Sequence, residues 1–458
     1  MLLLFPDNKW IAASFNIVYK PAVLKPSEPI LAPKYHWEGN RTHMYGTVIK
    51  SDNGYEMYYQ CGNALRIGYA QSGDGLHWER PMINAADFKA HAHQVVQAND
   101  GIAPFDVPEL GEGLEMTNLA AGYHMPSIIY EPESNRPYKL FAYGEAGYRV
   151  LYSHNGKQFH EYPNNPAIAL LAFPNKERKK TWYSDVAPAF KEQSGYTAMV
   201  KTYHIDAQGR TRRCVGRATS RDFMNWSRVE TLWIPGEAED AIAKKRGFEW
   251  ADFYGLCPFA YGSGYLGFLW LFEIEKELPH GTNQGKMEVF LAYSPDGLAW
   301  QRLSDTPLIP WDLNFGDEGG MITTPGAPLF EEDHIKLYYS DSNFEHGLHE
   351  KDFTKVIEKP TWVTRCAIIE KERLVGAFSN HGRLELRPMS FYGRTLRLNL
   401  TCKHGRVIVR YLVSGHEVVR QEIVNVDTTD LSLEPAFKGD ATLVIELHHA
   451  TLYAIELV

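Results

Sequence analysis

Short stretches of alternating apolar and polar residues, or brief apolar runs, recur along this chain between turns rich in Gly, Asp and Ser. Such stretches are typical of β-strands. The only convincing helix lies at 236–250, where acidic residues come first and basic residues last, as the helix dipole favours. The pattern therefore predicts an all-β protein with one helical insertion.

One turn pattern, Ser-x-Asp/Asn-Gly-x-x-aromatic in its fullest form, occurs four times. Its copies begin at Ser72, Ser153, Ser220 and Ser294, which places successive copies 67–81 residues apart. We expect the Asp or Asn to bond local backbone, the Gly to adopt a positive φ and the aromatic ring to pack over the turn. The spacing fits a repeated four-stranded sheet with loops.

Each turn closes a strand that follows two others, a leading strand and a Tyr-rich strand, and a fifth set follows with a degenerate end. The leading strands are expected at 43–49, 124–130, 184–190, 251–259 and 321–330. Five such units predict a five-bladed β-propeller over 1–376, with 1–30 closing the ring or wrapping its outside. Alternation without the turn repeat predicts a C-terminal β-sandwich over 377–458.

Composition narrows the classes of partner. The 458 residues carry a net charge of −9 without a basic run, so no nucleic-acid partner is expected. Five widely separated Cys favour reduced thiols. No apolar run approaches roughly 18 residues, so no membrane span is expected. The N-terminal MLLLF is too short for a signal peptide. The compartment and a homo-oligomer are left open.

The loops that lead into the innermost strands of a propeller meet at one mouth of its channel, so polar residues there are the site candidates. We predict three catalytic acids, Asp185, Asp252 and Glu318. Glu318 is the expected general acid, Asp185 the base or nucleophile, and Asp252 a group that orients water or tunes the acid, although these roles are interchangeable at this stage. The expected substrate-binding residues are Glu38, Arg41, His43, His124, Trp37, Trp182, Trp250 and Tyr254.

Each of these residues also has a structural interpretation. An acid before a strand can cap a turn or pair with an Arg. His43 and His124 share a His-Met pattern and can belong to the repeat itself. No HxH or HExxH spacing occurs, so no metal site and no cofactor are predicted, while a structural Ca²⁺ in the channel is left open.

The repeated units, the Ser-x-Asp-Gly-x-x-Trp turn and the trailing sandwich resemble the five-bladed propeller glycoside hydrolases of families 32, 43, 62, 68 and 130. The chain is most similar to family-32-like bacterial hydrolases in ILAPKYHWEG (30–39), GTVIKSDNGYEMYYQ (46–60) and FYGRTLRLNL (391–400). The fructosidase WMNDPNG-type signature is absent, and Glu38, Asn40 and Arg41 stand at the corresponding positions, so no catalytic triad is carried over.

The resemblance implies a carbohydrate substrate, and a shallow funnel suits exo-acting hydrolysis of a plant or algal oligosaccharide. Two alternatives stay open. One is a family-130-type phosphorylase, in which Arg41, His43 and His124 would bind phosphate. The other is a non-catalytic carbohydrate-binding propeller.

Overall fold

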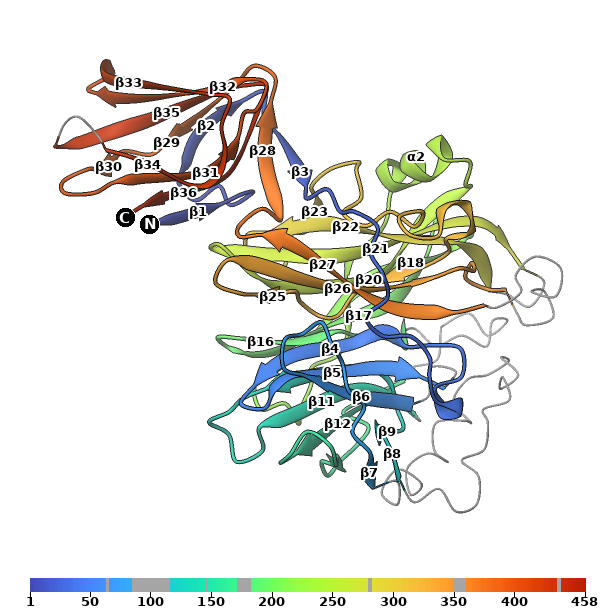
Figure 1. Ribbon diagram of the computed structural model, residues 1–458. Helices are drawn as coiled ribbons and strands as arrows, with labels where there is room; N and C mark the ends of the chain where they lie inside the picture. Colours follow the sequence, from blue (N-terminus) through green and yellow to red (C-terminus); the bar gives the residue numbers. More distant parts are fainter. Residues whose placement is uncertain are drawn as a thin grey trace.

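The computed structural model describes residues 1–62, 66–84, 116–144, 146–170, 183–278, 282–348, 360–434 and 438–458. These residues are mainly β-strands, arranged as a ring of sheets with a separate sandwich beside it (Figure 1). The predicted helix is present as α2 (Glu237–Lys245), and it ends early because Gly247 adopts a φ of 91°. In the described part of the chain, no helix is long and apolar enough to cross a membrane. The predicted all-β class is confirmed.

Five antiparallel sheets follow one another in chain order within the described residues. The first contains β4 (His43–Ser51), β5 (Gly54–Cys61), β6 (Arg66–Ser72) and β9 (Leu119–Ala121). The second contains β10 (His124–Tyr130), β11 (Tyr138–Gly144), β12 (Gly147–Ser153), β13 (His160–Glu161) and β14 (Ile168–Ala169). The third contains β15 (Tyr183–Ser184), β16 (Ala189–Glu192), β17 (Gly195–Ile205), β18 (Thr211–Ser220) and β19 (Glu230–Trp233).

The fourth sheet contains β20 (Trp250–Tyr261), β21 (Gly264–Glu277), β22 (Asn283–Ser294) and β23 (Gln301–Arg302). The fifth contains β24 (Ile322–Thr323), β25 (Leu329–Phe330), β26 (His334–Ser342) and β27 (Trp362–Glu370). A separate two-stranded ribbon pairs β7 (Ile83–Asn84) with β8 (Met116–Thr117).

The sheets close into a ring because each one contacts the next and the fifth contacts the first. β4 contacts β10, β10 contacts β16, β16 contacts β20, β22 contacts β24, and β24 contacts β4. At the closure, the Met44 N–H donates to Ser340 Oγ (2.6 Å), and Thr364 Oγ1 donates to the Thr42 carbonyl (2.7 Å). The N–H of Leu31 also bonds the carbonyl of Thr364. Ring closure therefore brings the leading strands around one axis.

Two further sheets form the C-terminal sandwich. One contains β1 (Leu2–Leu4), β3 (Val18–Pro21), β28 (Val375–Ser379), β31 (Leu396–Thr401), β34 (Asp427–Leu433) and β36 (Ala450–Leu457). The other contains β2 (Ile11–Phe15), β29 (Gly382–Leu386), β30 (Met389–Ser390), β32 (Arg406–Val413), β33 (His416–Val424) and β35 (Asp440–His448). The N-terminal strands thus pair with the sandwich, not with the ring that 1–30 was expected to close or wrap.

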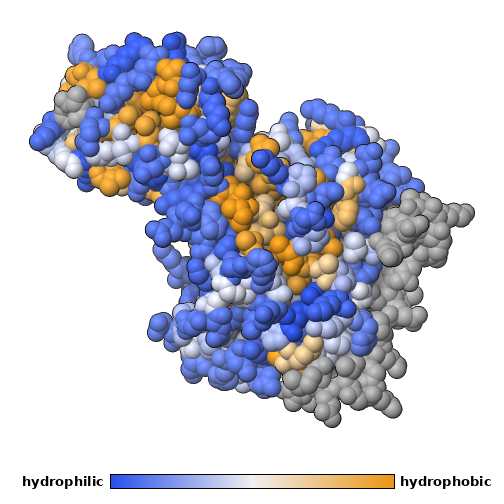
Figure 2. Space-filling model, in the orientation of Figure 1, coloured by the Kyte–Doolittle hydropathy of each residue, from blue (hydrophilic) through white to orange (hydrophobic). Residues whose placement is uncertain are grey.

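Alternate residues of the sandwich strands form its interior. Leu384, Leu398, Val409 and Ile445 are fully buried. Other apolar residues of the same domain stay exposed, as Figure 2 shows on its visible face; exposed examples are Phe15, Val18, Val418 and Val424. The boundary between the two domains near residue 376 remains a prediction.

The repeated turns lock neighbouring sheets together. In the first turn Ser72 Oγ accepts the Gly75 N–H (2.9 Å), and Asp74 Oδ1 accepts the Leu76 N–H (2.8 Å). Tyr338, from the fifth sheet, donates its hydroxyl to the Gly75 carbonyl (2.9 Å). In the second turn Tyr58 of the first sheet does the same to Gly156 (2.9 Å). These turns are therefore elements of packing between sheets.

Candidate active site

Three leading strands have irregular pairing at or near the residues of the candidate site. The pairing of β4 with β5 shifts between His43 and Thr47, and that of β10 with β11 shifts between His124 and Ser127. On β20, Tyr254 is the unpaired residue of a shift between Phe253 and Gly255. Such bulges re-aim side chains and often adjoin active sites.

Asp185 stands between the second and third sheets. It lies in the connection from β15 to β16, and its side chain is 29% exposed. Its Oδ1 is 2.7 Å from Nζ of Lys201 on β17, and its Oδ2 is 3.5 Å from Nε2 of His124 on β10. A carboxylate that solvent can reach is therefore supported by a buried cation and an imidazole.

The charges around Asp185 keep it ionised. Burial alone would raise the pKa of Asp185, but Lys201 and the hydrogen bond with His124 hold that pKa well below its usual value. Burial would lower the pKa of Lys201, but Asp185 and Tyr254 raise it above its usual value. At neutral pH the pair is consequently a carboxylate and an ammonium ion.

Tyr254 and His346 continue the cluster to the fourth and fifth sheets. Nζ of Lys201 lies 4.0 Å from the centre of the Tyr254 ring. The Tyr254 hydroxyl is 3.2 Å from Nε2 of His346, whose Nδ1 is 2.8 Å from the carbonyl oxygen of Asn283. Burial and Arg213 lower the pKa of His346 to about 3, so the ring is neutral. Nδ1 then carries the proton, because it faces a carbonyl, and Nε2 accepts from Tyr254.

His43 is fixed between aromatic rings. Its ring stacks on Trp362 at 3.8 Å and on Tyr45 at 4.2 Å between centres, and its Nε2 is 2.8 Å from Thr323 Oγ1. Tyr45 in turn meets His124 edge-on at 5.3 Å. Burial, Arg41 and His124 lower the pKa of His43 well below its usual value, so it is neutral. We call His43, Tyr45, His124, Asp185, Lys201, Tyr254 and His346 the central cluster.

Arg41 adjoins this cluster, two residues before His43 on the same chain segment. Its side chain is partly exposed, and its backbone bridges to Trp362, the residue that stacks on His43. Its Nε donates to Asn40 Oδ1 at 3.4 Å, and within the described ranges no carboxylate forms an ion pair with it. Burial lowers the pKa of Arg41 to about 10, where it is still charged.

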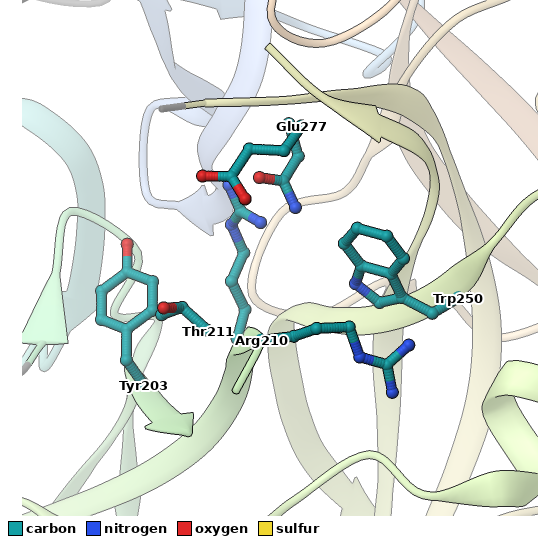
Figure 3. Close-up of a pocket in the computed structure, with 7 residues that line it drawn as sticks. Tyr203, Arg210, Thr211, Trp250 and Glu277 are labelled. Atoms are coloured by element: carbon teal, nitrogen blue, oxygen red, sulfur yellow. The ribbon is translucent and has the colours of Figure 1, made fainter. Parts of the chain in front are cut away.

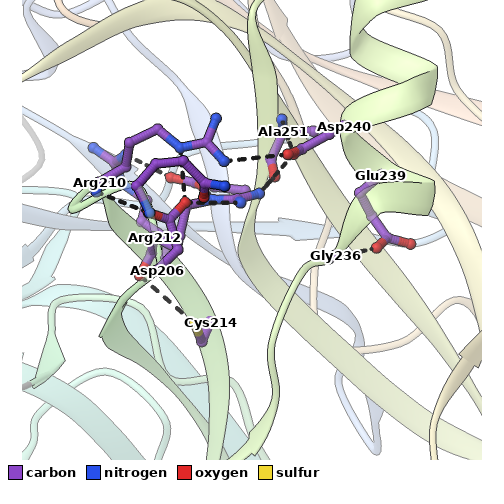
Figure 4. Close-up of polar contacts among 11 residues, drawn as sticks. Asp206, Arg210, Arg212, Cys214, Gly236, Glu239, Asp240 and Ala251 are labelled. Carbon is purple, nitrogen blue, oxygen red and sulfur yellow. Dashed lines mark hydrogen bonds and ion pairs between the residues drawn. The ribbon is translucent and has the colours of Figure 1, made fainter.

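Asp252 does not lie open to solvent. It is fully buried, with Oδ1 2.9 Å from Nε of Arg212 and Oδ2 3.2 Å from Nη1 of Arg213. Burial raises the pKa of Asp252 although both arginines oppose it. Arg212 continues to Asp240 at the start of α2, 2.7 Å away, in the network that Figure 4 draws. Among the described residues, Arg213 links Asp252 to the central cluster, since it pairs with Asp252 and lies 5.8 Å from the Tyr254 ring.

Trp250 lies in a small pocket beside this network. The pocket is lined by Tyr203, Arg210, Thr211, Arg213, Trp250, Glu277 and Asn283. Figure 3 shows Tyr203 and Thr211 on one side and Trp250 on the other. The Arg210 guanidinium lies 5.2 Å from the centre of the Trp250 ring. Arg213 and Asn283 link this pocket to the central cluster, through the Tyr254 ring and through Nδ1 of His346 respectively.

Glu38 and Trp37 are covered by protein. Glu38 accepts the N–H groups of Lys34 (2.7 Å) and Tyr35 (2.9 Å) and the Nε–H of Arg80 (2.8 Å). Trp37 donates its indole N–H to Asn118 Oδ1 at 2.8 Å. Both side chains thus hold the segment that leads into the first sheet, a structural use that replaces the expected contact with substrate.

Of the remaining two candidates, only Glu318 belongs to the described residues, and it does not join the central cluster. Glu318 ends the short helix η2 (Gly316–Glu318) and is exposed, and its carboxylate has no partner in the part of the chain that the structure describes. Trp182 lies outside the described residues.

Sequence reasoning missed Lys201, Tyr45 and His346. The one available signal was Lys201, a lysine inside the otherwise apolar stretch of its strand, because a buried lysine requires a partner. A metal was not expected, and among the described residues no group of three His, Cys, Asp or Glu side chains is arranged to hold one.

No protein-family model matches this chain, and no curated protein sequence is similar to it. Three solved structures with a similar fold are glycoside hydrolases. A thermostable family-43 glycoside hydrolase is 11% identical, with 72% of this chain and 91% of that chain covered and a TM-score of 0.43. A glycosyl hydrolase from Bacteroides ovatus is 14% identical, with 76% and 94% covered and a TM-score of 0.43.

The third is the catalytic domain of a Coprinopsis cinerea GH62 alpha-L-arabinofuranosidase, which is 11% identical, with 78% and 97% covered and a TM-score of 0.42. Families 43 and 62 are among those that the sequence resembles. Because these identities and TM-scores are low, a function for this chain has to be argued from its own side chains.

Proposed function

We propose that the protein is a glycoside hydrolase and that the central cluster is its active site. The observation that carries the proposal is Asp185, an ionised and partly exposed carboxylate beside Lys201 and His124. Around it, polar side chains from different sheets contact one another in sequence, from His124 and Lys201 to Tyr254 and His346. A carboxylate at such a point can act on the anomeric carbon of a terminal sugar or on a water molecule beside it.

The protonation state of Asp185 restricts its role. Because its pKa lies well below the usual value, it is a poor proton donor at neutral pH and a suitable base or nucleophile. The general acid must then be a second group. We assign this role to Glu318 on the basis of its position in the sequence alone. Its side chain is exposed and has no partner among the described residues, so it is free to move.

Asp252 has a supporting role in this proposal. Its two ion pairs fix Arg212 and Arg213, and Arg213 faces Tyr254 and Phe272 at 5.8 Å and 5.0 Å from their ring centres. Asp252 would therefore act as a positioning residue for one wall of the site, not as a group that exchanges protons with substrate. Exo-action on a plant or algal oligosaccharide belongs to the same proposal.

The two alternatives fit the cluster less well. A glycoside phosphorylase uses phosphate itself as the nucleophile and needs no carboxylate base, and an ionised Asp185 at the site would repel the phosphate. A non-catalytic binding protein does not require a carboxylate held ionised by a buried lysine, which costs desolvation of both charges. In a hydrolase, the Asp185–Lys201 ion pair would keep Asp185 ionised for its role as base or nucleophile.

The test compares Asp185→Asn with Asp430→Asn, an exposed sandwich residue, on a panel of activated aryl glycosides. We expect the unmodified protein and Asp430→Asn to turn over one class of glycoside and Asp185→Asn to lose turnover while it still binds sugar by calorimetry. Full activity of Asp185→Asn would refute the assignment. Sugar binding without turnover by the unmodified protein would favour the non-catalytic alternative, and turnover that requires phosphate would favour a phosphorylase.

A further inference from the structure

Three arginines in the described part of the ring are neutralised by carboxylates, whereas Arg41 is not. Arg80 pairs with Glu38 at 2.8 Å, Arg213 with Asp252 at 3.2 Å, and Arg365 with Asp341 at 2.9 Å. Arg41 has no carboxylate partner among the described residues. The hydrogen bond described for its side chain goes to the amide oxygen of Asn40, at the long distance of 3.4 Å.

The charges of the neighbouring groups leave Arg41 uncompensated. Lys201 is matched by Asp185 and Arg213 by Asp252. His43 and His346 are neutral, and burial raises the pKa of Tyr45, which keeps it uncharged near neutral pH. Among the described residues, Arg41 therefore keeps a positive charge without an ion-pair partner, beside the proposed active site and on a side chain that is partly exposed.

A partly buried guanidinium without a partner is costly, and a ligand anion would remove that cost. The planar guanidinium donates two parallel hydrogen bonds to a carboxylate, a geometry that an ammonium group does not offer. A single free charge also matches the single charge of a carboxylate better than the greater charge of inorganic phosphate.

We propose that Arg41 binds a carboxylate of the substrate, so that the sugar in the central cluster is a uronic acid. The inference rests on the proposed function for the identity of the site, and it adds the chemical class of the sugar. Arg41 would then be a specificity-determining residue. It would hold the carboxylate of the uronic acid while Asp185 stands at the reacting end of the same sugar.

Binding is measured first, because it does not depend on turnover. Calorimetry and thermal shift would compare D-glucuronate and D-galacturonate with D-glucose, D-galactose and inorganic phosphate. The proteins are the unmodified chain, Arg41→Ala, Arg41→Lys and the control Arg228→Ala, which removes one exposed positive charge elsewhere. We expect a uronate to bind about tenfold or more tightly than its neutral counterpart, since a hydrogen-bonded ion pair is worth at least that factor.

That preference should disappear in Arg41→Ala, survive in part in Arg41→Lys and stay unchanged in Arg228→Ala. Equal binding of uronates and neutral sugars, an Arg41→Ala variant that keeps the preference, or an Arg41-dependent site that takes phosphate and not uronate would each overturn the inference. If Arg41→Ala fails to fold, the unmodified chain and Arg41→Lys still decide the matter.

Activity separates this inference from the function on which it rests. Turnover of neutral aryl glycosides but not of aryl uronides would overturn the uronic acid and leave the hydrolase standing. Arg41-dependent binding of uronate without turnover of any glycoside would support the role of Arg41 and count against the hydrolase.

Discussion

Nζ of Lys201 lies 2.7 Å from Oδ1 of Asp185, so a lysine in the middle of β17 supports a carboxylate in the connection from β15 to β16. Lys201 is buried, with 3% of its side chain exposed, while Asp185 is 29% exposed. The ammonium charge of Lys201 is thus shielded from solvent, whereas solvent can reach the carboxylate charge of Asp185. This one-sided environment is what makes Asp185 a candidate to react.

Removing the lysine should change the pH dependence of activity. In Lys201→Met the largest influence that lowers the pKa of Asp185 is lost, so that pKa should rise. Because the reactive form is ionised, the acidic limb of kcat/KM against pH should move to higher pH. The control is Lys191→Met, which removes an exposed lysine paired with Glu131. An unchanged acidic limb would remove Lys201 from the site.

Two aspartates that sequence reasoning treated alike should respond differently to the same substitution. Asp185→Asn should lower kcat by about 10²–10⁴-fold, the range typical of a general base. It should destabilise the fold less than the loss of Asp252 does, because it breaks one ion pair whose carboxylate is partly exposed. Asp252→Asn breaks two buried ion pairs and should lower the free energy of unfolding by about 3–5 kcal/mol. Aryl glycoside kinetics and urea unfolding of both variants check this. A stable Asp252→Asn variant that has lost turnover would return Asp252 to a catalytic role.

The ring could be predicted because the repeated turn marks the end of one strand in four of the five units. Once that strand is located, the two strands that precede it can be located as well. The partners of the N-terminal strands were not predictable. β1, β2 and β3 are three to five residues long, and a short alternating stretch does not specify which distant strand it joins. Their pairing with β36, β29 and β28 depends on contacts across almost the whole chain.

In the candidate site, too, some residues could be predicted from the sequence and others could not. His43, His124, Asp185 and Tyr254 could be named because they lie at or near the start of the leading strands expected from the sequence, which converge in any propeller. Lys201 and His346 could not be assigned to the cluster, although a lysine in an apolar stretch signalled some buried partner, because they reach it from a second strand and from the connection after β26. Glu38 and Asp185 each have a carboxyl group, but that of Glu38 accepts backbone N–H groups of its own loop. Position in the chain does not reveal this difference.

The turn of the fourth sheet should contribute to stability through its closing tryptophan. Trp300 is 9% exposed and donates its indole N–H to the Gly297 carbonyl at 3.0 Å. Trp300→Ala should cost about 3–5 kcal/mol of unfolding free energy. Leu298→Ala in the same turn is the control. It is 50% exposed and should cost less than about 0.5 kcal/mol. Similar values for the two variants in chemical denaturation would contradict the packing role.

The third turn has a phenylalanine, Phe223, where the other three turns have glycine. Phe223 adopts the same left-handed backbone with a φ of 70°. Its ring is fully buried against Tyr196 and Trp226. Phe223→Gly should therefore destabilise by about 2–4 kcal/mol, less than burial of the ring alone implies, because glycine relieves the backbone strain. A variant as stable as the unmodified chain in urea would show that strain outweighs packing.

Glu273 and Glu288 form a buried carboxyl pair beside α2, and they should make stability depend on pH. Arg246, next to the end of α2, pairs with both of them, at 3.3 Å in the case of Glu273. Burial and the neighbouring Glu288 raise the pKa of Glu273 from 4.5 to about 8. The folded protein therefore holds a proton that the unfolded chain releases near pH 4.5. This contribution to stability is fully present below pH 4.5 and is lost as pH rises to about 8.

Glu273→Gln keeps the size of the side chain and removes this titration. Relative to the unmodified chain, its free energy of unfolding should improve as pH rises from 5 to 8, by up to about 4 kcal/mol at roughly 1.4 kcal/mol per pH unit. Urea unfolding at pH 5, 6.5 and 8 measures the difference. Glu275→Gln, on the same strand but 44% exposed, is the control and should show no such trend. If Glu273→Gln changes the free energy of unfolding equally at all three pH values, Arg246 keeps both Glu273 and Glu288 ionised, and the folded protein holds no extra proton.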